Sequence, residues 1–194
     1  RGDAGRTPSI TQTDLLITQP FKIGDYTIEA SLNVLNLFDE DEAQVLDPTT
    51  AYQMVSMLAG VVQRGTGTAV KAVGKPLAGK TGTVDDNTDA WFVGFDPEIT
   101  VGVWIGFDDK RKSLGTAEQG SFAALPMWME FMKGYIDGRP DKAEPPQFEA
   151  PGNIVFLSVQ KGDGAVLPSD TPGAIREAFI SGTQPGAGGF SRQP

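Results

Sequence analysis

The chain of 194 residues contains no cysteine and no histidine. The absence of cysteine excludes disulfide bonds and thiolate nucleophiles, and the absence of histidine removes the commonest metal ligand and the usual general base. Carboxylates alone can bind metal ions, but no spacing of acidic residues in this sequence supports such a site. We therefore expect no metal and no other cofactor.

Basic charge and long apolar runs are also scarce. The chain has 16 basic and 25 acidic residues and a formal net charge of −9, so nucleic acid, whose phosphates require a basic surface, is not an expected partner. No apolar stretch approaches the roughly 18 to 20 residues of a membrane-spanning helix, and no signal-like segment opens the sequence. A hydrophobic content of 39% suffices for one sizeable core, so we expect one domain with trailing segments.

The most informative stretch covers residues 74–107. Its first part, Gly-Lys-Pro-Leu-Ala-Gly-Lys-Thr, fits the phosphate loop of nucleotide-binding proteins, whereas Lys80, Thr81 and Gly82 fit the Lys-Thr-Gly element of penicillin-interacting serine enzymes. A phosphate loop opens a helix whose N-terminal N–H groups hold the phosphate. Turn formers and carboxylates without helical periodicity follow Thr81 instead, so nucleotide binding is the weaker alternative.

The following residues predict a β-hairpin. Residues 90–95 form an unbroken apolar run, typical of a strand covered on both faces. The Asp-Pro-Glu sequence at 96–98 predicts a turn, and residues 99–107 alternate with a period of two. Glycines 102 and 106 beside Trp104 indicate a face on which another element, which we expect to be a helix, approaches the backbone.

The sequence AGKTGTVDDNTDAWFVGFDPEITVGVWIGFDD, preceded by VLDPTTAYQMVSMLAGVVQRGTGTAV, resembles the C-terminal part of the transpeptidase domain of class A (bifunctional) penicillin-binding proteins. The resemblance covers residues 45–138 and rests on a long ordered set of residues. It implies an α+β fold, an antiparallel sheet flanked by helices, present here only as its C-terminal portion. It also implies peptidoglycan cross-linking: an active-site serine attacks the D-Ala-D-Ala bond of a stem peptide, and an amino group of a neighbouring stem takes the acyl group.

The resemblance assigns roles to four residues. Lys80 would supply positive charge near the attacking serine and the substrate carboxylate, and would relay a proton. Thr81 and Thr83 would hydrogen-bond the terminal carboxylate of the donor peptide or of a β-lactam, and the N–H of Thr83 would be one of two oxyanion donors. Gly82 would let the substrate backbone approach closely, because a side chain there would fill the cleft.

We do not expect the serine nucleophile of that family in this chain, although two short motifs match the family's serine elements. A serine acyltransferase needs Ser-x-x-Lys one helical turn apart, so that the amine faces the hydroxyl. The match at 158–161 falls at the end of a predicted strand, where residues three apart point to opposite faces. Ser31-Leu32-Asn33 spells the Ser-x-Asn element, but we interpret it as the ordinary sequence that follows that element. We therefore expect one wall of an active site without its serine.

Two helices should flank these strands. Asp47 followed by Pro48 is a helix start with a capping carboxylate, and Gly65 and Gly67 should end this helix. The resemblance implies that the helix packs under the sheet, so its methionines should fill the core. A second helix over 124–136 should cover the Trp104 face of the hairpin. The predicted apolar stripes are Ala51, Met54, Val55, Leu58, Val61 and Val62 for the first helix, and Ala124, Met127, Trp128, Phe131, Met132, Tyr135 and Ile136 for the second.

We divide the chain into four segments. They are an irregular N-terminal segment at 1–46, the C-terminal part of a transpeptidase domain at 47–138, a proline-rich linker at 139–151, and a C-terminal extension at 152–194. In the first segment a short strand near residues 15–17 should pair with residues 21–29, and the carboxylates at 39–42 should form a solvated loop. The extension should hold a strand at 154–159, a helical turn at 174–180 and a disordered end.

The resemblance also implies partners. It points to a stem peptide and β-lactam antibiotics as ligands, and to an N-terminal remainder of the same protein that carries the serine, a glycosyltransferase domain and a membrane anchor. That places the protein at the periplasmic face of the bacterial inner membrane, and a cysteine-free sequence is compatible with this compartment. The chain alone should be inactive. A serine β-lactamase or β-lactam sensor, and a binding module without chemistry, stay open as other functions.

Overall fold

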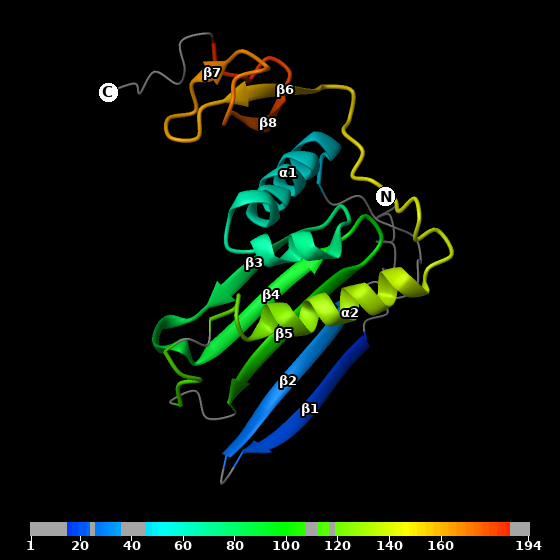
Figure 1. Cartoon of the computed structure of the whole chain (residues 1–194), viewed down its shortest axis with the longest axis vertical. Helices are drawn as coiled ribbons and strands as arrows, with labels where there is room; N and C mark the ends of the chain where they lie inside the picture. The colour runs from blue at the N-terminus through cyan, green and yellow to red at the C-terminus, as the bar shows by residue number, and fades with distance from the viewer. Residues whose placement is uncertain (1–14, 24–25, 36–45, 108–111, 117–118, 187–194) are drawn as a thin grey trace, which may run out of the picture.

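The computed structural model describes residues 15–23, 26–35, 46–107, 112–116 and 119–186. These residues form two antiparallel sheets with two α-helices, α1 (Pro48–Arg64) and α2 (Ala124–Gly138), and two short 3-10 helices, η1 (Thr68–Val73) and η2 (Asp85–Asn87) (Figure 1). The predicted α+β class is therefore confirmed. None of the helices in this part of the chain is long and apolar enough to cross a membrane.

The larger sheet has the strand order β1-β2-β5-β4-β3. Its strands are β1 (Leu15–Ile23), β2 (Tyr26–Leu35), β3 (Ala78–Thr83), β4 (Asp89–Phe95) and β5 (Thr100–Phe107). The hairpin β4–β5 confirms the strands and the turn predicted from residues 90–107. The expectation that residues 90–95 are covered on both faces is wrong, because Trp91 and Val93 are each 42% exposed while Ala90 and Phe92 are fully buried. Since β4 is the only strand of the described residues that pairs with β3, the Lys-Thr-Gly segment lies on an edge of this sheet.

The N-terminal hairpin is longer than expected. Residues 21–23 continue β1 and do not begin its partner, which is β2, so the predicted strand boundary is wrong. The weak alternation of this segment contains little information about where one strand ends and the next begins. β2 also pairs with β5, which joins this hairpin to the main sheet. The acidic cluster at 39–42 lies outside the described residues.

Helix α1 begins and ends where the sequence predicts. The carboxylate of Asp47 accepts hydrogen bonds from the hydroxyl and the N–H of Thr49, the latter at 2.9 Å, and from the N–H of Thr50 at 3.3 Å. These bonds satisfy N–H groups that have no partner inside the helix, and they lower the pKa of Asp47. At the other end, the N–H of Gly65 donates to the carbonyl of Val61.

The methionines of α1 do not fill the core, contrary to the prediction. Met54 and Met57 are 47% and 54% exposed, while Thr49, Gly60 and Val62 are the buried residues of the helix. The reason is the position of α1, which packs against β3, η1 and the C-terminal strand β8 (Ile175–Ile180) and does not lie beneath the whole sheet. Among the described residues, no element covers the side that bears these two methionines.

Helix α2 covers the Val101 face of the sheet, not the Trp104 face that was predicted. Trp128 is fully buried, its ring centroid lies 4.9 Å from that of Phe92, and its indole N–H donates to the carbonyl of Val101 at 3.0 Å. On the opposite face the indole of Trp104 lies over Gly106, where an added Cβ would approach it to 2.3 Å. Gly106 thus makes room for a tryptophan of its own strand. No helix of the described residues packs on this face, so the expectation of a helix there is wrong.

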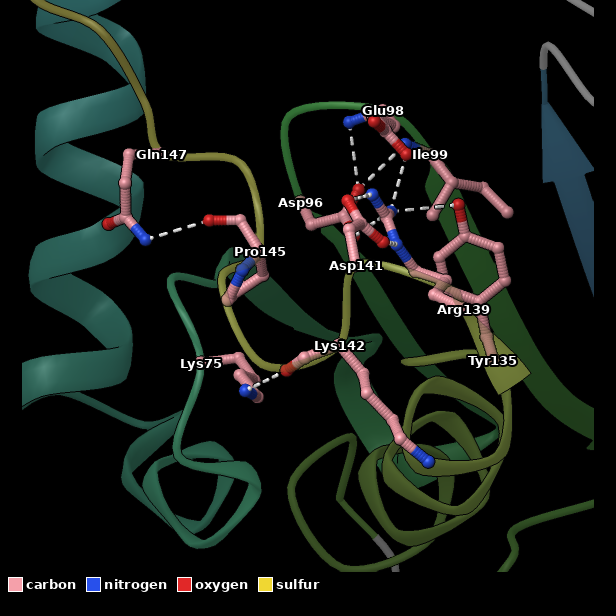
Figure 2. Close-up of polar contacts among 10 residues, drawn as sticks. All are labelled: Lys75, Asp96, Glu98, Ile99, Tyr135, Arg139, Asp141, Lys142, Pro145 and Gln147. Carbon is pink, nitrogen blue, oxygen red and sulfur yellow. Dashed lines mark hydrogen bonds and ion pairs between the residues drawn. The ribbon is translucent and has the colours of Figure 1, made fainter. Parts of the chain in front are cut away.

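The residues after α2 are anchored to the main sheet. The guanidinium of Arg139 makes two hydrogen bonds to Asp141, at 2.8 and 2.7 Å, and pairs with Asp96 at 3.5 Å and with Glu98 (Figure 2). The side chains of Arg139 and Asp96 are only 9% and 8% exposed. This cluster ties the end of α2 and the start of the 139–151 segment to the β4–β5 turn.

The C-terminal extension forms a second sheet of order β7-β6-β8, with β6 (Ile154–Val159) and β7 (Val166–Leu167). In Figure 1 it lies beyond α1, on the side away from the main sheet. The strand predicted at 154–159 is confirmed, but the helical turn predicted at 174–180 is wrong. This segment pairs with β6 along its whole length, so tertiary pairing decided a stretch whose local pattern was ambiguous. The predicted disordered end falls largely on residues 187–194, outside the described part.

Candidate active site

Strand β3 presents the four predicted site residues on the sheet edge. Two glycines allow it to lie there: an added Cβ at Gly79 would come within 2.8 Å of the backbone of Gly94 and of the ring of Phe92, and one at Gly82 within 3.0 Å of Trp91. Side chains alternate along a strand, so Lys80 and Gly82 share one face while Thr81 and Thr83 share the other.

The backbone of β3 alternates as well. The N–H of Val84 donates to the carbonyl of Asp89, which makes these residues a hydrogen-bonded pair that continues the register of β3 and β4. In an antiparallel ladder such pairs recur every second residue. Lys80 and Gly82 therefore use their backbone groups toward β4, and the N–H groups of Thr81 and Thr83 point to the outer side of the edge strand.

The ammonium of Lys80 lies against the polar atoms of Thr81. Its Nζ donates to the carbonyl of Thr81 at 2.7 Å and to the hydroxyl of Thr81 at 3.2 Å. Both Lys80 and Thr83 are exposed. A positive charge and two hydroxyl groups thus occur together on one accessible strand edge, a combination suited to binding an anionic group such as a carboxylate.

Apolar side chains flank Lys80 on its own face. Val93 and Trp91 stand opposite Lys80 and Gly82 in the register, and each is 42% exposed. Trp91 also contacts Trp104, with ring centroids 6.2 Å apart. The lysine therefore emerges beside an exposed apolar surface, against which the aliphatic part of a ligand can pack.

Gly120 is a site residue that the sequence analysis missed. Its N–H donates to the hydroxyl of Thr83 at 3.2 Å, and its carbonyl accepts from Leu125 in the first turn of α2. An added Cβ would lie 2.3 Å from the carbonyl oxygen of Trp91 and 2.6 Å from that of Gly82. The sequence analysis assigned it no role, and its position four residues before the helix predicted at 124–136 was the one available signal.

The Gly120 contact also affects the proton of Thr83. A hydroxyl has one proton and two acceptor lone pairs. Because Thr83 accepts from a backbone N–H, its own proton stays available to donate to a ligand. Also between β5 and α2, the N–H of Leu114 donates to the carbonyl of Asn87 at 2.8 Å.

The structure does not bring the other two candidate motifs to this edge. Ser158 lies in β6 of the small sheet, as expected, and its hydroxyl donates to the carbonyl of Ser169 at 3.4 Å. The backbone of Ser31 in β2 pairs with Trp104, so β5 and β4 separate it from β3. Three strand spacings amount to about 14 Å. In the described residues, neither serine stands beside Lys80.

The phosphate-loop alternative also lacks its required geometry. Lys80 lies inside a strand, and the chain after Thr81 continues as β3 to Thr83 and then forms η2. A three-residue 3-10 turn does not offer the row of N–H groups found at the start of an α-helix.

The chain is similar to known proteins over most of its length. Residues 35–124 match the family described as penicillin binding protein transpeptidase domain. The chain contains part of a penicillin-binding protein transpeptidase domain. Penicillin-binding protein 1A of Rickettsia bellii is 39% identical over 147 residues, which are 75% of this chain and 17% of that protein. Penicillin-binding protein 1A of Pseudomonas aeruginosa is 37% identical over 163 residues, 80% of this chain and 19% of that protein.

A solved structure supports the same assignment. The crystal structure of penicillin-binding protein 1A from Haemophilus influenzae superposes with a TM-score of 0.63 and 28% identity, covering 73% of this chain and 22% of that one. The chain thus spans less than a quarter of the penicillin-binding proteins that it resembles, and it holds a portion of their transpeptidase domain.

Proposed function

We propose that this chain forms the Lys-Thr-Gly wall of a serine-dependent D,D-transpeptidase that cross-links peptidoglycan through D-Ala-D-Ala stem peptides and is acylated by β-lactams. The observation that carries the proposal is the accessible edge strand on which the Lys80 ammonium donates to the hydroxyl of Thr81, with the exposed Thr83 two residues further along the same strand. This strand lies inside the matched transpeptidase segment. The serine nucleophile belongs to the N-terminal remainder of the same protein. That remainder also supplies a membrane anchor and a glycosyltransferase domain, and the site lies at the periplasmic face of the inner membrane.

Each residue of the edge has a role in this reaction. The hydroxyls of Thr81 and Thr83 hold the terminal carboxylate of the donor peptide or of the antibiotic, and the charge of Lys80 stabilises the same carboxylate and the ionised serine. The outward N–H of Thr83 stabilises the oxyanion that forms on the attacked carbonyl; loss of a comparable donor costs about 2.7 to 4 kcal/mol of transition-state stabilisation. Gly82 keeps the edge free of a side chain where the substrate backbone passes.

The proposal is tested with fluorescent penicillin on the full-length protein. We expect covalent labelling of the unmodified protein, no labelling of Lys80→Ala, and no labelling of the 194-residue chain by itself. Lys71→Ala removes an exposed lysine of η1 and serves as the matched control, which should label normally. Labelling of Lys80→Ala at the normal rate would contradict the assignment, and loss of the label within minutes would favour a β-lactamase.

A further inference from the structure

The loop after α1 brings Thr66 to the Lys-Thr-Gly strand. The hydroxyl oxygens of Thr66 and Thr81 lie 2.8 Å apart, although the two residues are 15 positions apart in the sequence. The backbone on both sides of Thr66 is held: the N–H groups of Gly65 and Gly67 both donate to the carbonyl of Val61, at 2.9 and 3.3 Å. Gly67 is buried, and a Cβ there would lie 3.7 Å from the ring of Phe92. Thr66 therefore projects from a loop that is anchored to the core.

The hydrogen bonds of Thr81 can be counted. Lys80 has only donors on its ammonium, so the Thr81 hydroxyl must accept from it, which occupies one lone pair. One lone pair and one proton remain, and Thr66 takes one of them. If Thr66 donates, the proton of Thr81 stays free; if Thr81 donates, the proton of Thr66 does. In both cases the pair keeps one proton free for a ligand, and the hydroxyl oxygen of Thr81 is held between Lys80 and Thr66.

We infer that Thr66 is a positioning residue of the transpeptidase site, whose hydroxyl orients that of Thr81 for the carboxylate of the donor peptide or β-lactam. The inference rests on the proposed function, since it needs Thr81 to bind that carboxylate. Thr66 acts through Thr81 and the free proton of the pair. Its loss weakens recognition of the anion more than it slows the chemical step.

The test measures the rate of acylation of the full-length protein against the concentration of fluorescent penicillin. Thr66→Val keeps the shape of the side chain and removes the hydroxyl, and we expect a roughly 3- to 10-fold lower second-order acylation constant, the range of one net hydrogen bond. The loss should appear in the apparent binding constant and not in the maximal rate. Thr66→Ser should restore most of the constant, and Thr68→Val, which alters an exposed threonine at the start of η1, should change nothing.

A second probe separates positioning from a merely structural effect. With the methyl ester of the same penicillin, which lacks the carboxylate, the difference between the unmodified protein and Thr66→Val should disappear. Normal acylation of Thr66→Val would overturn the inference and leave the proposed function intact. A defect of the same size in Thr66→Ser, or one that persists with the methyl ester, would also overturn the inference alone. Absence of labelling in the unmodified protein would overturn both.

Discussion

Gly120 offers the sharpest test of how the edge strand is supported. Replacing it with alanine would place a Cβ 2.3 Å from the carbonyl oxygen of Trp91 and 2.6 Å from that of Gly82. Both are backbone atoms of paired strands, which cannot turn aside as a flexible side chain would. The loop must shift, and overpacking of this kind costs about 1 to 3 kcal/mol. For a domain of about 150 to 250 residues, at about 2 to 4 °C per kcal/mol, that corresponds to a melting temperature lower by roughly 2 to 12 °C.

The same shift breaks the hydrogen bond from the N–H of Gly120 to Thr83. Thermal unfolding and penicillin acylation of full-length Gly120→Ala should therefore both be impaired, the acylation constant by roughly 3- to 10-fold. Gly134→Ala is the matched control, because Gly134 is exposed on α2 and a Cβ there meets nothing within 4 Å. Alanine in a helix is favoured over glycine by about 0.5 to 1 kcal/mol, so this variant should melt slightly higher. A melting temperature of Gly120→Ala equal to or above that of the unmodified protein would refute the argument.

Two further predictions concern the anchors of the fold. Arg139→Gln leaves the buried carboxylate of Asp96 without its cationic partner. We expect the free energy of unfolding to fall by about 1 to 3 kcal/mol, measured as a lower melting temperature, with Lys133→Ala at an exposed position of α2 as the control. An unchanged melting temperature of Arg139→Gln would contradict the role of the cluster. Asp47 has a pKa lowered by its bonds to Thr49 and Thr50, so its carboxylate stabilises the fold above the unfolded pKa of about 3.9, and this contribution is lost as the pH falls through the lower folded value. Asp47→Asn should retain the cap and remove that pH dependence from thermal unfolding as the pH is lowered from about 5. An identical pH profile in both proteins would contradict a contribution from the Asp47 carboxylate.

Local signals were sufficient for several elements. Asp47 and Pro48 predicted the start of α1 because capping and the fixed φ of proline act within one helical turn. The alternation at 99–107 predicted β5 because the period of two is a property of the strand itself. The absence of a helical pattern after Thr81 argued against a phosphate loop, and Lys80 lies inside β3.

Predictions that depended on a partner element were wrong where the partner was not visible in the local pattern. The stripe on α2 identified Trp128 as a core residue, but not that it would pack on Phe92 and leave Trp104 on the other face. Met54 and Met57 of α1 were expected in the core, but both are exposed. Residues 175–180 became a strand because β6 was available to pair with them.

The sequence by itself determined the family and the residue types of the Lys-Thr-Gly segment, because these follow from an ordered motif. The position of this segment on a sheet edge follows from strand pairing. Only the tertiary structure decided which groups surround the two threonines. Thr66 reaches Thr81 across 15 residues and Gly120 reaches Thr83 across 37, through a helix end and a loop that are held against the same core. No local pattern contains such contacts, since they depend on how separate elements pack once hydrophobic burial has brought them together.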